Sequence, residues 1–257
     1  MSVGGWVSGG LPAERRWIRR ELARRARPGL SPALREYLGS TLPTLGVSAP
    51  DLHRIVREFR HRHGPQPYSR VGPLLRALWA GRTYDERILA IELLERCVVP
   101  LDAPTWHLAS TWVDDATGWA LSDSLAAGPV ARMVAEDPHR FKELLVWTRS
   151  ESIWRRRAAT YALNDLVRAG ELDRPLRLLG RLVRDPAFWV QRAVGTWLRE
   201  CWKNDSLRTD RFLRRHLFAL APVAITVATE RAPKPYRAEL RAARSVHSGH
   251  AHKRRTR

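Results

Sequence analysis

The sequence of 257 residues contains few cysteines, few lysines and no long apolar run. Two cysteines, Cys97 and Cys201, are too few for a disulfide framework or a four-ligand zinc site. The longest apolar candidate, residues 217–229, is shorter than the roughly 20 residues of a membrane span and contains Pro222. The first ten residues lack the basic and apolar regions of a secretory signal. We therefore expect a cytoplasmic protein that does not associate with membranes.

Acidic residues are also few relative to basic ones. The chain has 45 Lys and Arg against 26 Asp and Glu, which gives a formal net charge of +19. Only four of the basic residues are lysines, so 41 are arginines, and the planar guanidinium group suits phosphate oxygens. This composition favours nucleic acid as the partner. Charge alone leaves two alternatives open: arginines spread over solvated helix faces, and attraction to anionic membranes.

Strand signals are almost absent, apart from a short β-branched stretch at residues 225–227. Helix signals cover nearly the whole chain. Pro12 stands at a favoured first helical position, Pro28 and Gly29 end that basic segment, and Ser31 begins the next helix. The sequence therefore predicts an all-α fold.

The chain shows no glycine-rich linker in its middle, so we expect a single main domain over residues 11–244. Residues 1–10 are predicted to form a flexible N-terminus. Residues 245–257 contain three histidines and four basic residues without an acid, which indicates a disordered basic tail.

A repeat of 35 residues is the most informative pattern in the sequence. Aromatic residues recur at this spacing: Tyr84, Trp119, Trp154 and Trp189. The residues three positions later are Arg87, Ser122, Arg157 and Arg192. The residues four positions later are Ile88, Asp123, Ala158 and Ala193. Nine positions later Leu93, Leu163 and Leu198 agree, whereas Gly128 departs. Such a period in a helical chain predicts an α-solenoid of stacked helical pairs.

Asp123 is the exception in this repeat. Its siblings, Ile88, Ala158 and Ala193, are residues suited to helix packing. Burying an unpaired carboxylate costs several kcal/mol, so stacking alone would not select aspartate there. Two interpretations are open: a functional carboxylate, or a helix cap or internal salt bridge to one of the many arginines.

Several segments together resemble the AlkD-type DNA alkylation repair family, the bacterial DNA glycosylases built from HEAT-like helical repeats. The resemblance covers roughly residues 33–230. It is carried by EYL (36–38), LPTLGV (42–47), Pro50, LW (78–79), residues 84–94, WALSD (119–123), SIWRRRA (152–158) and FWVQRAVGTWLRE (188–200).

The resemblance implies a C-shaped solenoid whose concave basic face holds duplex DNA. Members of the family excise cationic alkylated purines such as 3-methyladenine and 7-methylguanine, leaving an abasic site. They are thought to do so without drawing the damaged base into a pocket, unlike other glycosylases. By this resemblance we expect a monofunctional DNA N-glycosylase, a hydrolase that acts as a monomer associated with the nucleoid. We expect no metal and no cofactor.

The resemblance also assigns residues. Asp123 corresponds to the catalytic aspartate, Trp119 to the tryptophan one helical turn before it, and Arg157 to the arginine that holds a phosphate near the lesion. The further residues expected to contact DNA are Arg87, Arg156, Arg192, Trp154, Trp189, Thr196 and Trp197.

Thr196 departs from the family pattern. The family usually has a second active-site tryptophan at this position, and here Trp197 follows it, about 100° further round a helix. The sequence leaves open whether Trp197 takes over this role or whether one aromatic wall is absent.

Three functions are compatible with these features. An alkylpurine DNA glycosylase is favoured by Asp123 and Arg157. A non-catalytic relative that binds damaged or branched DNA is favoured by Thr196. Helical repeats also serve as protein-binding scaffolds, which the basic charge disfavours. The pair His61 and His63, expected in a loop, is a weak metal motif.

Overall fold

The computed structural model of the chain describes residues 10–116 and 118–255. It contains helices and no strand within these residues, and its one β-bridge joins Gln66 and Val98. The prediction of an all-α fold is confirmed. The predicted flexible N-terminus falls on residues 1–9, outside the described residues, and on Gly10, where the first helix begins. No helix in the described part is both long and apolar enough to cross a membrane.

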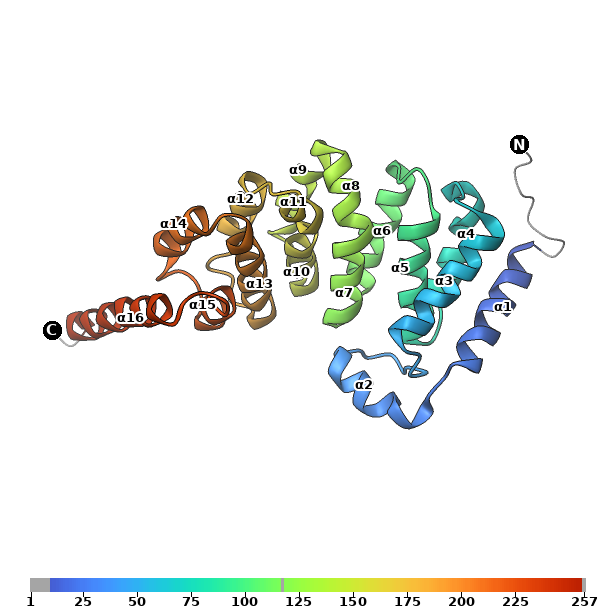
Figure 1. Cartoon of the computed structure of the whole chain (residues 1–257), viewed down its shortest axis with the longest axis horizontal. Coiled ribbons are helices and arrows are strands. Elements are labelled where there is room, and N and C mark those ends of the chain that lie inside the picture. Colours follow the sequence, from blue (N-terminus) through green and yellow to red (C-terminus); the bar gives the residue numbers. More distant parts are fainter. Residues whose placement is uncertain (1–9, 117, 256–257) are drawn as a thin grey trace. The chain divides into compact units, whose positions relative to one another are not determined.

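The chain divides into two compact units, Met1–Asp137 and Pro138–Arg257. Unit 1 contains α1 (Gly10–Arg24), η1 (Pro28–Leu30), α2 (Ser31–Leu38), α3 (Ala49–His63), α4 (Tyr68–Trp79), α5 (Tyr84–Cys97), α6 (Ala103–Asp115), α7 (Trp119–Leu125), η2 (Ala126–Val130) and α8 (Ala131–Glu136) (Figure 1). Unit 2 contains α9 (Pro138–Trp147), α10 (Ile153–Tyr161), α11 (Asn164–Arg168), α12 (Asp173–Arg181), α13 (Phe188–Asn204), α14 (Ser206–His216), α15 (Pro222–Ala228) and α16 (Lys234–Arg255).

The 35-residue repeat marks the first turns of four helices. Tyr84 and Trp119 are the first residues of α5 and α7, and Trp154 and Trp189 are the second residues of α10 and α13. All four residues of the register that contains Asp123 are buried: Ile88, Asp123, Ala158 and Ala193. The register predicted to pack is therefore buried, and the structure shows that the repeated aromatic residues lie at helix starts. The solenoid arrangement of the helices remains a prediction.

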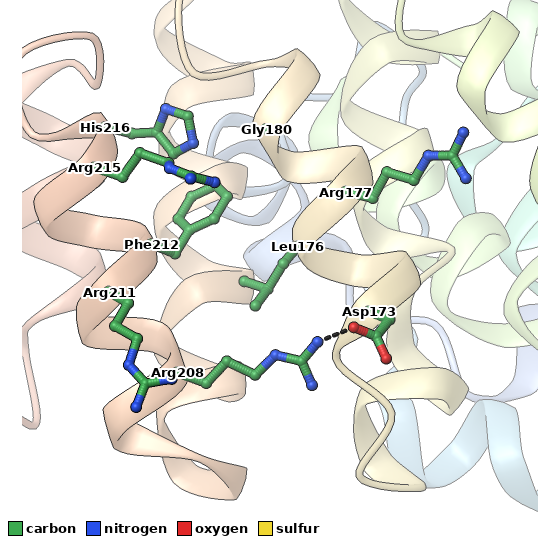
Figure 2. A pocket seen from close by; sticks show the side chains of 9 residues that line it. All are labelled: Asp173, Leu176, Arg177, Gly180, Arg208, Arg211, Phe212, Arg215 and His216. Carbon is green, nitrogen blue, oxygen red and sulfur yellow. Dashed lines mark hydrogen bonds and ion pairs between the residues drawn. The ribbon is translucent and has the colours of Figure 1, made fainter.

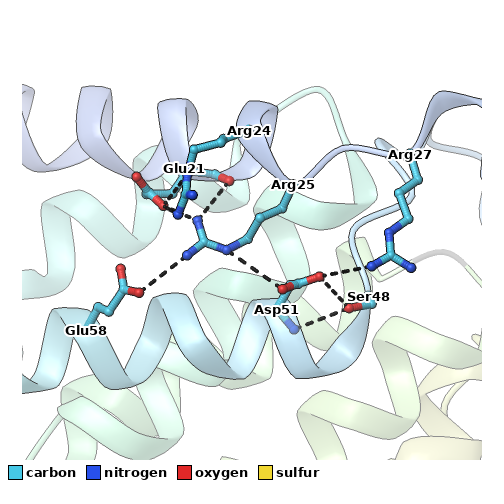
Figure 3. Close-up of polar contacts among 7 residues, drawn as sticks. All are labelled: Glu21, Arg24, Arg25, Arg27, Ser48, Asp51 and Glu58. Carbon is cyan, nitrogen blue, oxygen red and sulfur yellow. Dashed lines mark hydrogen bonds and ion pairs between the residues drawn. The ribbon is translucent and has the colours of Figure 1, made fainter.

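Arginines hold part of unit 1 together. Arg25, which follows α1, places its Nη2 3.3 Å from Oε1 of Glu58 and its Nε 3.9 Å from Oδ1 of Asp51, both on α3 (Figure 3). Arg27 lies 3.5 Å from the same aspartate, which also accepts a hydrogen bond from Ser48. Such ion pairs are worth little individually. They show that some of the positive charge stabilises the fold and is not available to a partner.

Helices α13 and α15 of unit 2 approach each other closely. A Cβ atom on Gly195 would lie 2.5 Å from the carbonyl oxygen of Ala224, so only glycine permits this approach. The β-branched stretch at 225–227, which carries a strand signal, lies inside α15. Tertiary packing against α13 overrides that local preference.

Helix α16 extends into the segment for which a disordered tail is predicted. The helical backbone of α16 continues to Arg255 and includes residues 245–255, most of the segment predicted to be a disordered tail. Residues 234–244 contain several alanines and arginines, which are good helix formers, and Leu240 is buried. Residues 245–250 have low helix propensity, so local preference does not account for the continuation of the helix. Residues 256–257 lie outside the described part.

Candidate catalytic and DNA-binding residues

Helix α7 begins at a backbone junction that requires glycine. Gly118 has φ +82°, and a Cβ there would lie 2.1 Å from the carbonyl oxygen of Gly39, directly after α2. The left-handed conformation and the close approach both exclude a side chain. The junction therefore fixes the backbone position from which the side chain of Trp119, the next residue, projects.

Trp119 is held by the end of α2. Its indole Nε1–H donates a hydrogen bond of 2.9 Å to the carbonyl oxygen of Tyr37, and the two rings meet edge to face at 5.4 Å. An open groove of about 530 Å³ lies beside this contact, lined by residues that include Arg35, Glu36 and Gly39. The Tyr37 ring itself is exposed. Trp119 itself is half-buried.

A buried carboxylate organises the loop that follows α2. Asp85 on α5 accepts hydrogen bonds from the Thr44 hydroxyl at 2.8 Å and from the backbone N–H groups of Leu45 at 2.6 Å and Val47 at 3.1 Å. The backbone N–H of Tyr84 donates to the carbonyl of Pro43 at 2.9 Å. The family resemblance includes this LPTLGV segment, but sequence reasoning missed the role of Asp85, whose partners lie about 40 residues away.

Asp123 lies one helical turn after Trp119, and its side chain is 8% exposed. Residues i and i+4 share a face of a helix, so the carboxylate and the indole are neighbours on α7. The adjacent Ser122 is completely buried. The sequence analysis identified Asp123 as a carboxylate at a register position that is apolar in the other repeats. The structure shows that this position is buried.

The helix is distorted directly after this position. Residues Ala126–Val130 form a π-helical turn, and Gly128 has the non-helical angles φ −93° and ψ −106°. Gly128 is also the residue that departs from the leucine register, and a Cβ on it would lie 2.8 Å from Oε2 of Glu95. Single π-helical turns occur often at functional sites. The break in the repeat thus coincides with a break in the helix.

Arg87 lies against a stack of tryptophans in unit 1. The rings of Trp79 and Trp112 are parallel at 4.5 Å, and the guanidinium carbon of Arg87 lies 5.0 Å from the Trp79 ring. Its Nη1 donates to the carbonyl of Asp115 at 3.3 Å. These contacts place a half-buried cation on a rigid aromatic support.

Arg157 is buried in unit 2. Its Nη1 donates to the carbonyl of Trp189 at 2.6 Å, and its Nη2 donates to the Tyr161 hydroxyl at 3.1 Å. The guanidinium also lies over the Tyr161 ring at 4.9 Å. The arginine therefore links α10 to the start of α13.

The repeat tryptophans of unit 2 form an aromatic surface. The rings of Trp154 and Trp189 lie 6.3 Å apart, and Phe188 meets Trp189 edge to face at 5.4 Å. Phe188 is 54% exposed, and Trp189 is also exposed. Sequence reasoning missed Phe188, although its position beside a repeat tryptophan was a signal that could have found it.

The remaining residues predicted to contact DNA differ in their exposure and in their partners within the fold. Arg156 donates to both carboxylate oxygens of Asp185, at 2.6 and 3.3 Å, and Arg192 is exposed on α13. The hydroxyl of Thr196 donates to the carbonyl of Arg192 at 3.1 Å. Trp197 is buried and meets the Tyr161 ring edge to face at 5.6 Å. In this structure Trp197 therefore belongs to the core of unit 2 and does not supply an exposed aromatic wall.

The histidine pair lies in the last turn of α3, where a loop was expected. His63 is buried, with Nε2 3.3 Å from a carboxylate oxygen of Glu14. Gly64, with φ +65°, ends the helix after them. The described residues contain no group of three or more His, Cys, Asp or Glu side chains placed to hold a metal ion.

Comparison with known proteins places the chain in a family. The solved structures that the chain resembles include a protein described as a predicted DNA alkylation repair enzyme from Enterococcus faecalis, with 16% identity and a TM-score of 0.72 over 82% of this chain and 98% of that one. They also include AlkD2 from Streptococcus mutans, with 15% identity and a TM-score of 0.59 over 83% of this chain and 98% of that one. A further Streptococcus mutans protein has 15% identity and a TM-score of 0.59 over 86% of this chain and 100% of that one. No curated protein matches it. The profile of the DNA alkylation repair enzyme family matches residues 18–232. The chain therefore belongs to the DNA alkylation repair enzyme family.

Proposed function

We propose that this protein is a monofunctional DNA glycosylase that removes cationic alkylated purines, of the 3-methyladenine and 7-methylguanine type, from duplex DNA and leaves an abasic site. One observation carries this proposal. Asp123 is a buried carboxylate at a register position where the other repeats have apolar residues, between Trp119 and a π-helical turn. Helix packing alone does not require a carboxylate at a register position that is apolar in the other repeats.

The chemistry needs one carboxylate and no general acid. A purine alkylated on a ring nitrogen already carries positive charge, so it departs as a neutral base without being protonated. The sugar then develops oxocarbenium character, which a preorganised carboxylate stabilises electrostatically. Asp123 supplies the negative charge, and the electron-rich face of Trp119 supplies a second stabilising surface.

The arginines and aromatic residues are proposed to bind the DNA. Arg87 and Arg192 would neutralise phosphates, which fixes the register of the protein on the duplex but reads no sequence. Arg156 and Arg157 would do the same only on exchanging their partners within the fold, which are Asp185 for Arg156 and the Trp189 carbonyl and Tyr161 hydroxyl for Arg157. Trp154, Trp189 and Thr196 would lie against the strand. We propose that the protein acts as a monomer without a cofactor, in the cytoplasm and associated with the nucleoid.

A second function is favoured by one observation. Thr196 stands where the family usually has a tryptophan, and Trp197 is buried. A site with one aromatic wall fewer suits a non-catalytic protein that binds damaged or branched DNA. Release of 7-methylguanine from methylated duplex DNA by the unmodified protein separates the two functions.

The decisive variant is Asp123→Asn, which keeps volume and hydrogen-bonding capacity and removes the charge. Single-turnover release of 7-methylguanine should fall about 10²–10³-fold, since the loss of one such electrostatic contribution costs roughly 2.7–4 kcal/mol. Affinity for duplex DNA should persist or rise, because a negative charge leaves a phosphate-binding surface. The melting temperature should hold or increase.

Asp114→Asn is the matched control, because Asp114 is an exposed carboxylate on α6 of the same unit. It should release 7-methylguanine at the normal rate. If Asp123→Asn melts far lower and its folded fraction excises normally, Asp123 is structural and the proposed mechanism is wrong.

A further inference from the structure

Unit 2 contains an open groove of about 550 Å³ between α12 and α14 (Figure 2). Its lining includes Leu176, Arg177 and Gly180 from α12, and Arg211, Phe212 and Arg215 from α14. We call it the α12–α14 groove. It shares no residue with α10 or α13, which carry the residues of unit 2 proposed above to bind duplex DNA.

The groove is strongly cationic. Arg208 at one end pairs with Asp173, as the dashed line in Figure 2 shows. Arg177, Arg211 and Arg215 make no ion pair with any residue that the structure describes. Four arginines against one aspartate leave a clear surplus of positive charge, and arginine with no internal partner suits a phosphate oxygen.

The arginines of α14 are spaced along one face of the helix. Arg208, Arg211 and Arg215 follow the i, i+3, i+7 pattern and therefore point to the same side. Seven residues at 1.5 Å each span about 10 Å. A row of this length can follow consecutive phosphates of a nucleic-acid strand, rather than hold one isolated anion.

An aromatic pair lies among these arginines. The rings of Phe212 and His216 are 4.5 Å apart and tilted by 52°. Burial, with the neighbouring Arg215 and Arg184, lowers the pKa of His216 below its usual value, which favours the neutral imidazole. The pair thus offers an uncharged ring surface between cations.

Gly180 keeps this surface open. It lies inside α12, where glycine is among the poorest helix formers, and its φ is not positive. Among the described residues, leaving aside the neighbours of Gly180 and the backbone of α12, one heavy atom lies within 4 Å of a Cβ built on it: Cε2 of Phe212, at 3.7 Å. Neither backbone conformation nor crowding requires glycine here. A longer side chain at this position would extend toward the ring of Phe212.

We propose that the α12–α14 groove is a second nucleic-acid site, which binds a single strand with its phosphates on Arg177, Arg211 and Arg215 and an unpaired base on Phe212. A cationic groove combined with an aromatic platform is how proteins hold single strands without reading sequence. A paired base cannot reach such a platform, so duplex DNA is the weaker ligand. This site does not depend on the glycosylase proposal.

The test measures binding of a fluorescent oligothymidylate and of a duplex of equal length to the full chain, over a range of salt concentrations. The double variant R211A/R215A should reduce the slope of log affinity against log salt for the single strand by about 1.4, or about 0.7 for each phosphate that the variant no longer neutralises. Phe212→Leu should weaken single-strand binding about tenfold with little effect on the duplex.

Two further variants test whether the binding effects are specific to the groove. Gly180→Leu should weaken single-strand binding by covering Phe212, without removing any packed group. Arg168→Ala, an exposed arginine on α11, should leave affinity and slope unchanged. Thermal melts monitor folding, and the folded fraction is used throughout.

Three outcomes would overturn the proposal. The first is an affinity for the single strand that is the same in the groove variants as in the unmodified protein. Another is an equal loss of affinity for single strand and duplex, which would mean that no unpaired base is held. The third is reduced binding to vesicles of anionic phospholipid with unchanged oligonucleotide binding, which would assign the groove to a membrane surface.

Discussion

The indole N–H of Trp119 donates a 2.9 Å hydrogen bond to the carbonyl of Tyr37, a residue 82 positions earlier in the chain. This bond joins the proposed catalytic helix α7 to the end of α2. The close approach of Gly118 to Gly39 lies beside it. The proposed catalytic tryptophan is thus oriented by a backbone group, which a change of side chain at Tyr37 does not remove.

Trp119→Phe should separate the contribution of the indole hydrogen bond from that of the aromatic ring, because it removes the N–H donor and keeps a ring. Loss of one hydrogen bond should lower the free energy of unfolding by about 1 kcal/mol. Release of 7-methylguanine should fall moderately with phenylalanine and strongly with alanine, which removes the ring. Tyr37→Phe, which keeps the ring and the carbonyl, is the control and should match the parent in both assays. Normal release by Trp119→Ala would show that this ring has no part in excision.

Asp85→Ala should release the loop between α2 and α3. The Thr44 hydroxyl and two backbone N–H groups lose their buried acceptor, which should cost about 3 kcal/mol of unfolding free energy in chemical denaturation. Excision should also fall, because the loop leads from the residues that hold Trp119. Asp102→Ala removes a carboxylate that caps α6 locally, and it should cost about 1 kcal/mol with excision intact. Equal effects of the two variants on excision would contradict the proposed role of Asp85.

Thr196 and Trp197 should respond differently. Thr196→Trp should increase 7-methylguanine release if a missing aromatic wall limits the protein. Trp197→Ala leaves a cavity and should cost about 3–5 kcal/mol of stability, with normal excision by the folded fraction. Trp197→Phe should cost less, because Nε1 of Trp197 has no hydrogen-bond partner within the described residues. Loss of excision by folded Trp197→Phe would place this side chain at the reacting nucleotide.

The two cysteines should be inert in the folded protein. Burial raises the pKa of Cys97 to about 11 and that of Cys201 to about 12, because the thiolate is poorly solvated. A disulfide reagent at pH 8 should therefore label neither thiol until denaturant is added. Since the unfolded chain loses these protons near pH 9 and the folded chain does not, stability should decline as pH rises above about 9. Rapid labelling of the native protein would contradict this.

The sequence by itself determined the helical class and the buried register of Asp123. These follow from local rules, since capping and turn residues act within a few positions and a helix face repeats every 3.6 residues. The departure at Gly128 was also visible in the 35-residue repeat. The π-helical turn that it accompanies was not, and neither was the close approach of Gly128 to Glu95 on α5, which only packing brings about.

Only the tertiary structure decided which predicted side chains are engaged inside the fold. Arg156 binds Asp185, 29 residues away, and Trp197 faces Tyr161 in the core rather than the surface. A step of one residue turns a side chain about 100° round a helix, so exposure depends on how that helix is rotated against its neighbours. That rotation is set by long-range contacts such as Gly195 against Ala224. No local pattern contains them, because their partners are brought together only by packing.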